Sequence, residues 1–197
     1  MCDITGPGNS TSHQPDVTTV TVRPKNNDWN YSGNADILYL DGQDVACDHN
    51  EAISQFEMAV DGRRRSIRYN FSCSRSSKIT NNCQDKHTHK THTDSNSRQS
   101  IHFLDRHDMT CGDNWVIRRF KLDRSGKSIQ YSYTCCQTTN TGMCSMTTSP
   151  FFYIDGKNVD SLPNTAFSRI KLNALITLNT EGEGANYTYD TSQCYIN

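Results

Sequence analysis

Three segments of this chain align with one another without a gap, and this internal repeat is the feature that most restricts the fold. The segments run from Asp41 to Met58, from Asp105 to Leu122 and from Asp155 to Leu172. Matched positions carry identical or chemically similar residues. One position is always asparagine (Asn50/Asn114/Asn164), and three are always apolar (Ile53/Ile117/Phe167, Phe56/Phe120/Ile170 and Met58/Leu122/Leu172). One such short unit cannot bury its apolar side alone, so the three copies are expected to share one core.

Each copy ends in a stretch where apolar and polar residues alternate. The alternating apolar residues are Ile67, Tyr69, Phe71 and Cys73, then Ile129, Tyr131, Tyr133 and Cys135, then Tyr187 and Tyr189. A period of two is typical of an antiparallel strand with one buried face. Turn residues precede these stretches at 61–62, 125–126 and 182–184, which predicts one hairpin in each copy.

Each copy also opens with a short apolar run, at residues 37–40, 101–104 and 151–154, which predicts a further strand. We therefore expect a single all-β domain over residues 36–194, with repeats at 37–73, 101–144 and 151–194 in a pseudo-threefold β-prism or trefoil-like arrangement. Residues 74–100 form a polar insertion rich in His, Ser and Thr. Residues 1–35 are a polar N-terminal segment, in which Val17 to Val22 could supply an edge or donated strand.

Disulfide bonds are expected to support this domain. Only 34% of the residues are hydrophobic, against roughly 45–50% in ordinary globular chains, and the chain has nine cysteines. Zinc is the alternative, but no C-x-x-C occurs and Cys135 and Cys136 are the one adjacent pair, so disulfides are favoured. This use of cysteine indicates an oxidising, extracellular location.

The repeat itself predicts two of the bonds. Cys47 and Cys111 share one repeat position, and Cys73 and Cys135 share another. The third copy has Ser161 and Thr191 at these positions, and the joint replacement predicts the pairs Cys47–Cys73 and Cys111–Cys135. The partners of Cys2, Cys83, Cys136, Cys144 and Cys194 stay open, and their odd number requires a free thiol or an intermolecular bond.

Two groups of residues could bind ligands. His87, His89 and His92 have a spacing that could hold a divalent metal, but the lysines between them favour a solvated loop, so we expect no metal and no other cofactor. Acidic and amide residues recur at the start of each copy, and they could mark three sugar or calcium sites, although turn chemistry is the favoured explanation. These residues are Asp41 and Asp44, Asp105 and Asp108, and Asp155 and Asn158.

Four asparagines, Asn9, Asn30, Asn70 and Asn186, lie in N-x-S/T sequons and are candidate glycosylation sites in a secreted chain. A net charge of -1 provides no field for nucleic acid. No apolar stretch is long enough to cross a membrane, and the residues from Met1 onward do not resemble a signal peptide. None of the common catalytic motifs is present, so we expect no enzyme.

The second copy resembles the repeats of dermatopontin, an extracellular matrix protein. The resemblance rests on the segment from Cys111 through Asn114, Ile117 and Phe120, and on Tyr131-Ser-Tyr133-Thr-Cys135-Cys136 followed by Cys144. The vitelline membrane outer layer proteins, which are disulfide-linked β-prisms of three copies, are similar in organisation. The resemblance implies a secreted, matrix-like or lectin-like role.

The leading hypothesis is a secreted, non-enzymatic subunit of an extracellular matrix, coat or filament. Its partners would be itself or other extracellular subunits, joined by an intermolecular disulfide or by strand addition. The alternative is a lectin-like protein whose partners are glycans.

Overall fold

The computed structural model describes residues 21–31, 37–63, 66–92, 101–139, 144–149, 158–179 and 182–197. Within these ranges the regular elements are β-strands and two short 3₁₀ helices, so the all-β prediction is confirmed. No helix in this described part of the chain is both long and apolar enough to span a membrane.

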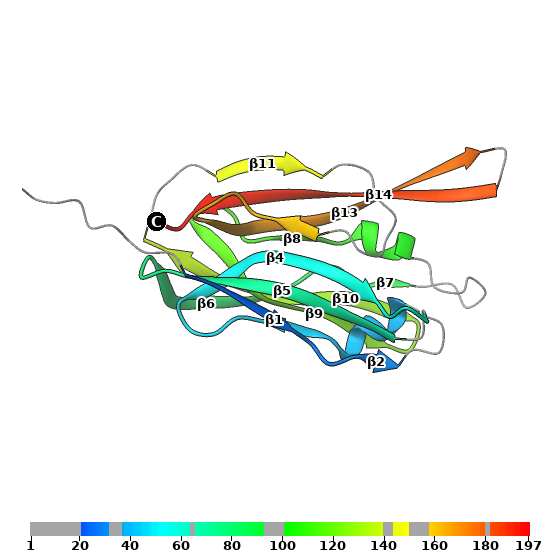
Figure 1. Ribbon diagram of the computed structural model, residues 1–197, viewed down its shortest axis with the longest axis horizontal. Coiled ribbons are helices and arrows are strands. Elements are labelled where there is room, and N and C mark those ends of the chain that lie inside the picture. The colour runs from blue at the N-terminus through cyan, green and yellow to red at the C-terminus, as the bar shows by residue number, and fades with distance from the viewer. Residues whose placement is uncertain are drawn as a thin grey trace, which may run out of the picture.

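The strands form three antiparallel sheets that are built alike (Figure 1). Each sheet has a central hairpin, and the hairpins are β4 (Glu51–Val60) with β5 (Ser66–Arg75), β9 (Trp115–Ser125) with β10 (Ser128–Thr138), and β13 (Thr165–Asn179) with β14 (Gly182–Tyr195). An edge strand lies beside the second strand of each hairpin, and these are β1 (Thr21–Asn26), β6 (Ile79–His87) and β11 (Cys144–Thr148). Two short strands, β2 (Asn30–Tyr31) and β7 (Thr91–His92), pair with β5 and β10 on the same sides as β1 and β6.

A short strand from elsewhere in the chain completes each sheet. β3 (Asp44–Ala46) pairs with β9, β8 (Asp108–Thr110) with β13, and β12 (Asn158–Asp160) with β4. The strand before the first hairpin thus joins the second sheet, the strand before the second joins the third, and the strand before the third joins the first. The three sheets are connected in a closed series.

A bulge in the first strand of each hairpin fixes these junctions. The register shifts after Ile53, Ile117 and Phe167, which leaves one extra residue in each strand. The carbonyl of that extra residue accepts a hydrogen bond from the residue that follows the incoming short strand. The three bonds run from Cys47 N to Arg118 O (3.0 Å), from Cys111 N to Ser168 O (2.8 Å) and from Ser161 N to Ser54 O (2.8 Å).

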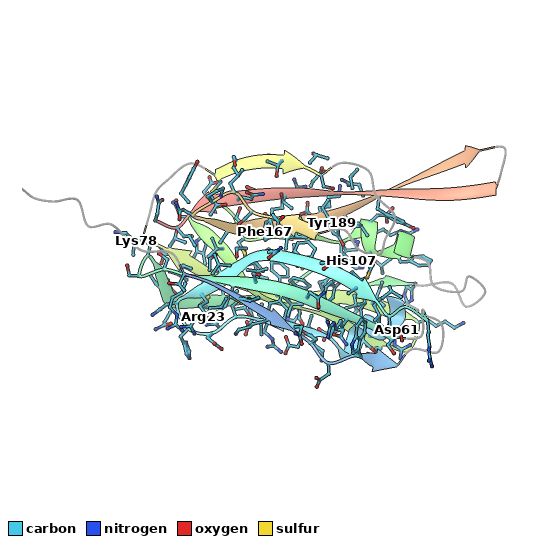
Figure 2. All side chains as sticks on the ribbon, viewed as in Figure 1. Arg23, Asp61, Lys78, His107, Phe167 and Tyr189 are labelled. Atoms are coloured by element: carbon cyan, nitrogen blue, oxygen red, sulfur yellow. A yellow bond between two sulfur atoms is a disulfide. The ribbon has the colours of Figure 1, made fainter. Side chains whose placement is uncertain are left out.

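The core lies between the sheets and is rich in aromatic side chains. Figure 2 shows Phe167 and Tyr189 pointing into this space. Phe56 makes edge-to-face contacts with Phe120, Phe167 and Tyr189 at centroid distances of 5.9, 5.7 and 5.1 Å. Burial raises the pKa of Tyr131 to about 12 and raises the pKa of Tyr189 further. These phenols therefore stay protonated inside the protein.

The apolar runs at the start of the first two copies are not strands, which corrects the prediction from sequence. Residues Ile37–Gly42 form the 3₁₀ helix η1 and residues Ile101–Arg106 form η2. Leu40 and Leu104 are buried in the core from these helices. A four-residue apolar run fits a buried strand or a buried helical turn equally well, so the sequence pattern could not separate them. The third run, at 151–154, lies outside the described residues.

The polar stretch at 74–100 contains strands where the sequence favoured a solvated loop. Ile79–His87 forms β6, and the disulfide between Cys83 and Cys136 links it to β10. The partner strand is about fifty residues further along the chain, and such a distant partner leaves little trace in the local pattern. In the N-terminal segment Thr21–Asn26 forms an edge strand that pairs with β5. The strand predicted at Val17 to Val22 overlaps it only at Thr21 and Val22, and residues 17–20 lie outside the described ranges.

Four disulfides join eight of the nine cysteines. The predicted bonds Cys47–Cys73 and Cys111–Cys135 are both present, with Cα–Cα distances of 5.7 and 5.5 Å. The other two, Cys83–Cys136 and Cys144–Cys194, attach the edge strands β6 and β11 to their hairpins. Each closes a loop of 24 to 53 residues, which is expected to stabilise the fold by about 3–4 kcal/mol. Cys2 lies outside the described residues.

The third copy has Gln193, and not Thr191, at the position of Cys73 and Cys135. Cys73 is opposite Ile53, and Gln193 is opposite the matching Phe167. The alignment from sequence was therefore shifted by two residues, because a period-two pattern fits equally well after a shift of two. Gln193 Oε1 accepts a hydrogen bond of 2.7 Å from Leu162 N. The glutamine amide thus links the strand and the loop that a disulfide links in the other two copies.

Candidate functional site

An open polar groove of about 720 Å³ lies between the first edge strand and the segment that leads into β3. One wall is the link between β1 and β2, and the other contains the end of η1 and the start of β3. The lining residues are Lys25, Asn26, Asn27, Asp28, Trp29, Asn30, Gly42, Gln43, Asp44 and Phe71.

Hydrogen bonds across the groove hold its two walls together. Asn27 Nδ2 donates to Asp44 O at 3.1 Å, and Gln43 Nε2 donates to Asp28 O at 3.1 Å. Gln43 is only 3% exposed, so this hydrogen bond lies beneath the surface of the groove and connects its two walls. A Cβ atom at Gly42 would lie 2.5 Å from Asn30 Nδ2, and a glycine there leaves room for that amide. The groove is therefore preformed by the fold.

Trp29 supplies an aromatic surface in this groove. Its side chain is 45% exposed, which is unusual for so large an apolar group. The Arg68 guanidinium lies over the indole ring, 4.3 Å from its centroid. This cation–π contact fixes the orientation of the ring and leaves nearly half of the side chain in contact with solvent.

The groove also offers hydrogen-bonding groups with no protein partner in the described part of the chain. Asn26 and Asp28 are exposed on either side of Asn27, and neither side chain makes a hydrogen bond within those residues. Together they present an amide donor, an amide acceptor and a carboxylate acceptor. The combination of an open aromatic surface with planar polar groups suits a ligand that has both hydroxyl groups and an apolar face.

Ion pairs neutralise the charges of Lys25 and Asp44 at the rim. Lys25 Nζ lies 3.2 Å from Asp48 Oδ2 and 3.8 Å from Glu51 Oε2, and its hydrogen bond lowers the pKa of Asp48. Arg119 makes two bonds of 2.7 Å to Asp44, and these raise the pKa of the guanidinium. The groove thus has no strong field of either sign, so a neutral ligand fits better than a highly charged one.

Three of the recurring aspartates, Asp41, Asp44 and Asp108, form ion pairs with arginines of the next copy. Asp44 of β3 binds Arg119 of β9, and Asp108 of β8 binds Arg169 of β13 at 2.6 Å. Asp41 pairs with Arg124 at 3.0 Å. Asp105 is near enough to Tyr187 to add to the rise in the pKa of that phenol, which is caused mainly by burial. Asp155 and the side chain of Asn158 lie outside the described part.

Turn chemistry does account for the recurring asparagines. Asn50, Asn114 and Asn164 have φ angles of 60°, 62° and 60°, in the left-handed region. Asparagine tolerates this conformation better than other non-glycine residues, so one turn geometry explains its recurrence at the matched position.

The three candidate metal ligands are not brought together. His87 is exposed on β6, the ring of His89 stacks on His107 at 5.5 Å, and His92 Nδ1 lies 3.1 Å from Ser128 Oγ. Among the described residues, no cluster of three or more His, Cys, Asp or Glu side chains could hold a metal ion.

Two of the four sequon asparagines have described side chains, and both lie in the first sheet. Asn30 lies in β2 at the groove, and Asn70 lies in β5, where its Nδ2 donates to Glu57 Oε2 at 3.2 Å. Asn186 lies in β14, although its side chain is not described, and Asn9 lies outside the described residues.

Sequence reasoning named Asn30 and Asp44 for other reasons but missed the groove and its other lining residues. The run Asn26-Asn27-Asp28-Trp29-Asn30 sets a lone tryptophan among amides and a carboxylate, and this composition was the available signal. The pattern could not reveal that Gly42–Asp44 form the opposite wall. Comparison with known proteins finds no matching family model, no matching curated protein and no matching solved structure.

Proposed function

We propose that this protein is an extracellular, non-enzymatic carbohydrate-binding protein and that the groove at Trp29 is its binding site. The observation that carries the proposal is the half-exposed indole ring, held by Arg68 and flanked by the exposed polar side chains of Asn26 and Asp28. A pyranose ring has one face of C–H groups and a rim of hydroxyl groups. The C–H face would lie on the indole, and the hydroxyl groups would bond to the amide and the carboxylate.

Two further proposals place this site in its setting. We propose that the three similar sheets are three copies of one unit around a pseudo-threefold axis, as in a β-prism. Four disulfides support secretion into an oxidising compartment, and the resemblance to dermatopontin and vitelline membrane outer layer repeats supports a matrix-like environment rich in glycans.

A glycan array followed by titration calorimetry with the best-bound soluble glycan tests the proposal. The wild-type protein should bind, and Trp29→Ala should weaken binding about tenfold or more, because loss of roughly 1.4 kcal/mol of stacking raises Kd tenfold. Tyr195→Ala is the matched control, since Tyr195 is a 42% exposed aromatic residue outside the groove, and it should bind like the wild type.

Two results would contradict the carbohydrate site. One is an array without any bound glycan, and the other is a bound glycan whose affinity is the same for Trp29→Ala as for Tyr195→Ala. Asp28→Asn gives a second readout, because it keeps the shape of the side chain and removes the charge. A several-fold change in affinity is expected for a ligand whose hydroxyl groups donate to this carboxylate.

A structural subunit of an extracellular matrix, coat or filament is the second candidate function. The observation that favours it is the uncharged outer edge of β11, whose residues Cys144–Thr148 include no Asp, Glu, Lys, Arg or Pro. A sheet edge of this composition is open to pairing with another chain.

A further inference from the structure

The outer edges of the three sheets are equivalent in position and differ in chemistry. β1, β6 and β11 each pair with the second strand of a hairpin. On these strands, Pro24 lies opposite Ser72, Asp85 opposite Thr134 and Met146 opposite Ser192. In each hairpin, the residue opposite the edge strand comes directly before the one that faces the start of the bulge. These residues are Ser72, Thr134 and Ser192, and the residues that follow them face Ile53, Ile117 and Phe167. Pro24, Asp85 and Met146 therefore occupy the same register position in their sheets.

Two of the three edges carry residues that oppose pairing with a further strand. β1 has Arg23, Pro24 and Lys25 in succession, and Pro24 has no N–H group to offer. β6 has Asp85 and Lys86 at the matching positions. Charges and proline on an edge strand are the usual means by which β proteins avoid edge-to-edge association.

The edge of β11 has none of these residues. Its sequence is Cys144-Ser145-Met146-Thr147-Thr148, and Met146 is 70% exposed, the most exposed large apolar side chain among the described residues. Two side-chain contacts fix the strand in place, since Cys144 is bonded to Cys194 and Thr148 Oγ1 donates to Asp190 Oδ1 at 2.8 Å. β11 is therefore an uncharged strand that is bonded to β14 near both ends and has an exposed methionine at its centre.

The backbone direction shows which groups of β11 face outward. Ser149 N donates to Tyr189 O on β14 at 2.9 Å. The backbone N–H and C=O groups of successive residues in a strand point in opposite directions. Those of Thr147 and Ser145 therefore also point toward β14, whereas those of Thr148, Met146 and Cys144 point away from it. The N–H and C=O groups of Met146 thus lie on the outer edge, and no strand in the described part of the chain pairs with them.

We propose that a second copy of this chain pairs with β11 by antiparallel strand addition, with a twofold axis at Met146. In this arrangement Met146 lies opposite Met146 of the second copy, and Cys144 lies opposite Thr148. The outward N–H and C=O groups of Cys144, Met146 and Thr148 then lie opposite the same groups of the second copy and can form hydrogen bonds with them. The edge of one copy can therefore pair with the same edge of another. The two exposed methionine side chains lie next to each other and are removed from water.

This inference goes beyond the carbohydrate-binding function and does not depend on it. In the view of Figure 1, β11 lies along one side of the molecule, while β1 and β2, which border the groove, lie along the other. Pairing at β11 therefore leaves both grooves open. Two grooves in one dimer would raise the apparent affinity for a surface that carries many glycans.

Sedimentation velocity of the full chain over a range of concentrations tests the pairing, with Met146→Pro and Met146→Asp as variants. Each variant introduces into β11 the residue type found at the same register position in β1 or β6. The proline removes only an outward N–H, so the pairing of β11 with β14 stays intact. The wild type should approach twice 22.3 kDa as concentration rises, and both variants should remain at 22.3 kDa.

Val22→Asp is the matched control, because Val22 is an apolar residue, 59% exposed, on the edge that is already charged. This variant should dimerise like the wild type. Far-ultraviolet circular dichroism of each variant reports whether it folds. If Met146→Pro does not fold, Met146→Asp, which keeps the N–H group, still tests the pairing. A wild type that stays at 22.3 kDa at every concentration, or folded variants that dimerise as strongly as the wild type, would overturn the inference.

Discussion

His107 is a buried histidine that contacts Tyr131 of β10 and the segment between β6 and β7, which contains Thr88 and His89. It is 2% exposed, and its Nδ1 lies 2.8 Å from the Thr88 hydroxyl, which also accepts a hydrogen bond of 2.9 Å from Tyr131 N. Burial, together with smaller effects of the nearby His89 and Arg106, lowers the pKa of His107 to about 4. The ring is therefore neutral in the folded protein at neutral pH.

This shift predicts a loss of stability in mild acid. The unfolded chain binds a proton at His107 below pH about 6.5, whereas the folded protein resists protonation until pH about 4. Stability is therefore complete above pH 6.5 and decreases as the pH falls toward 4, by roughly 3 kcal/mol in total. Urea unfolding at pH 7, 5.5 and 4 measures this decrease.

His107→Gln is the control for this prediction, since a glutamine can accept the Thr88 hydrogen bond without titrating. Its stability should depend less on pH between 6.5 and 4 than that of the wild type. If both proteins lose the same free energy of unfolding over this range, His107 is not the responsible group.

At the scale of single elements, the sequence predicted the hairpins and two of the disulfides. These are Cys47–Cys73 and Cys111–Cys135, which occupy matching positions in the first two copies. Alternating residues such as Ile67, Tyr69 and Phe71 record the buried face of a strand directly. The edge strands β6 and β11 were not predicted, because their partners lie some fifty residues away in sequence and their own side chains are mostly polar. The groove was missed for the same reason, since its two walls meet only after β1 has paired with β5.

The corrected alignment of the third copy gives a prediction for β14. Ser161→Cys combined with Gln193→Cys should form a disulfide, because these positions match those of Cys47 and Cys73, whose Cα atoms are 5.7 Å apart. The bond should replace the hydrogen bonds of Gln193 and raise the free energy of unfolding by about 3 kcal/mol. Peptide mapping without reduction identifies the bond.

Ser161→Cys combined with Thr191→Cys is the control, because it follows the alignment that the sequence pattern alone suggested. This pair should remain reduced, since Thr191 faces Ile170, three positions further along β13 than Phe167. Efficient bonding in the control and none in the first variant would show that the register of β13 and β14 is wrong.

At the scale of the whole molecule, the three sheets are joined by the exchange of short strands. Two junctions carry an ion pair, Asp44 with Arg119 and Asp108 with Arg169. At the third junction, Asn158 and Gln55 stand at the positions of the aspartate and the arginine, so both partners have changed together. The repeat could be read from the sequence, but the exchange could not, because each short strand has only three residues and its partner is in another copy.

The disulfide map tests the division of the strands into three sheets most directly. Proteolysis without reduction and mass spectrometry should find Cys47–Cys73, Cys83–Cys136, Cys111–Cys135 and Cys144–Cys194. The bonds of Cys83 and Cys144 are the decisive ones, because they form only if β6 and β11 lie at the edges of the second and third sheets. A map in which Cys83 or Cys144 has a different partner would contradict the arrangement.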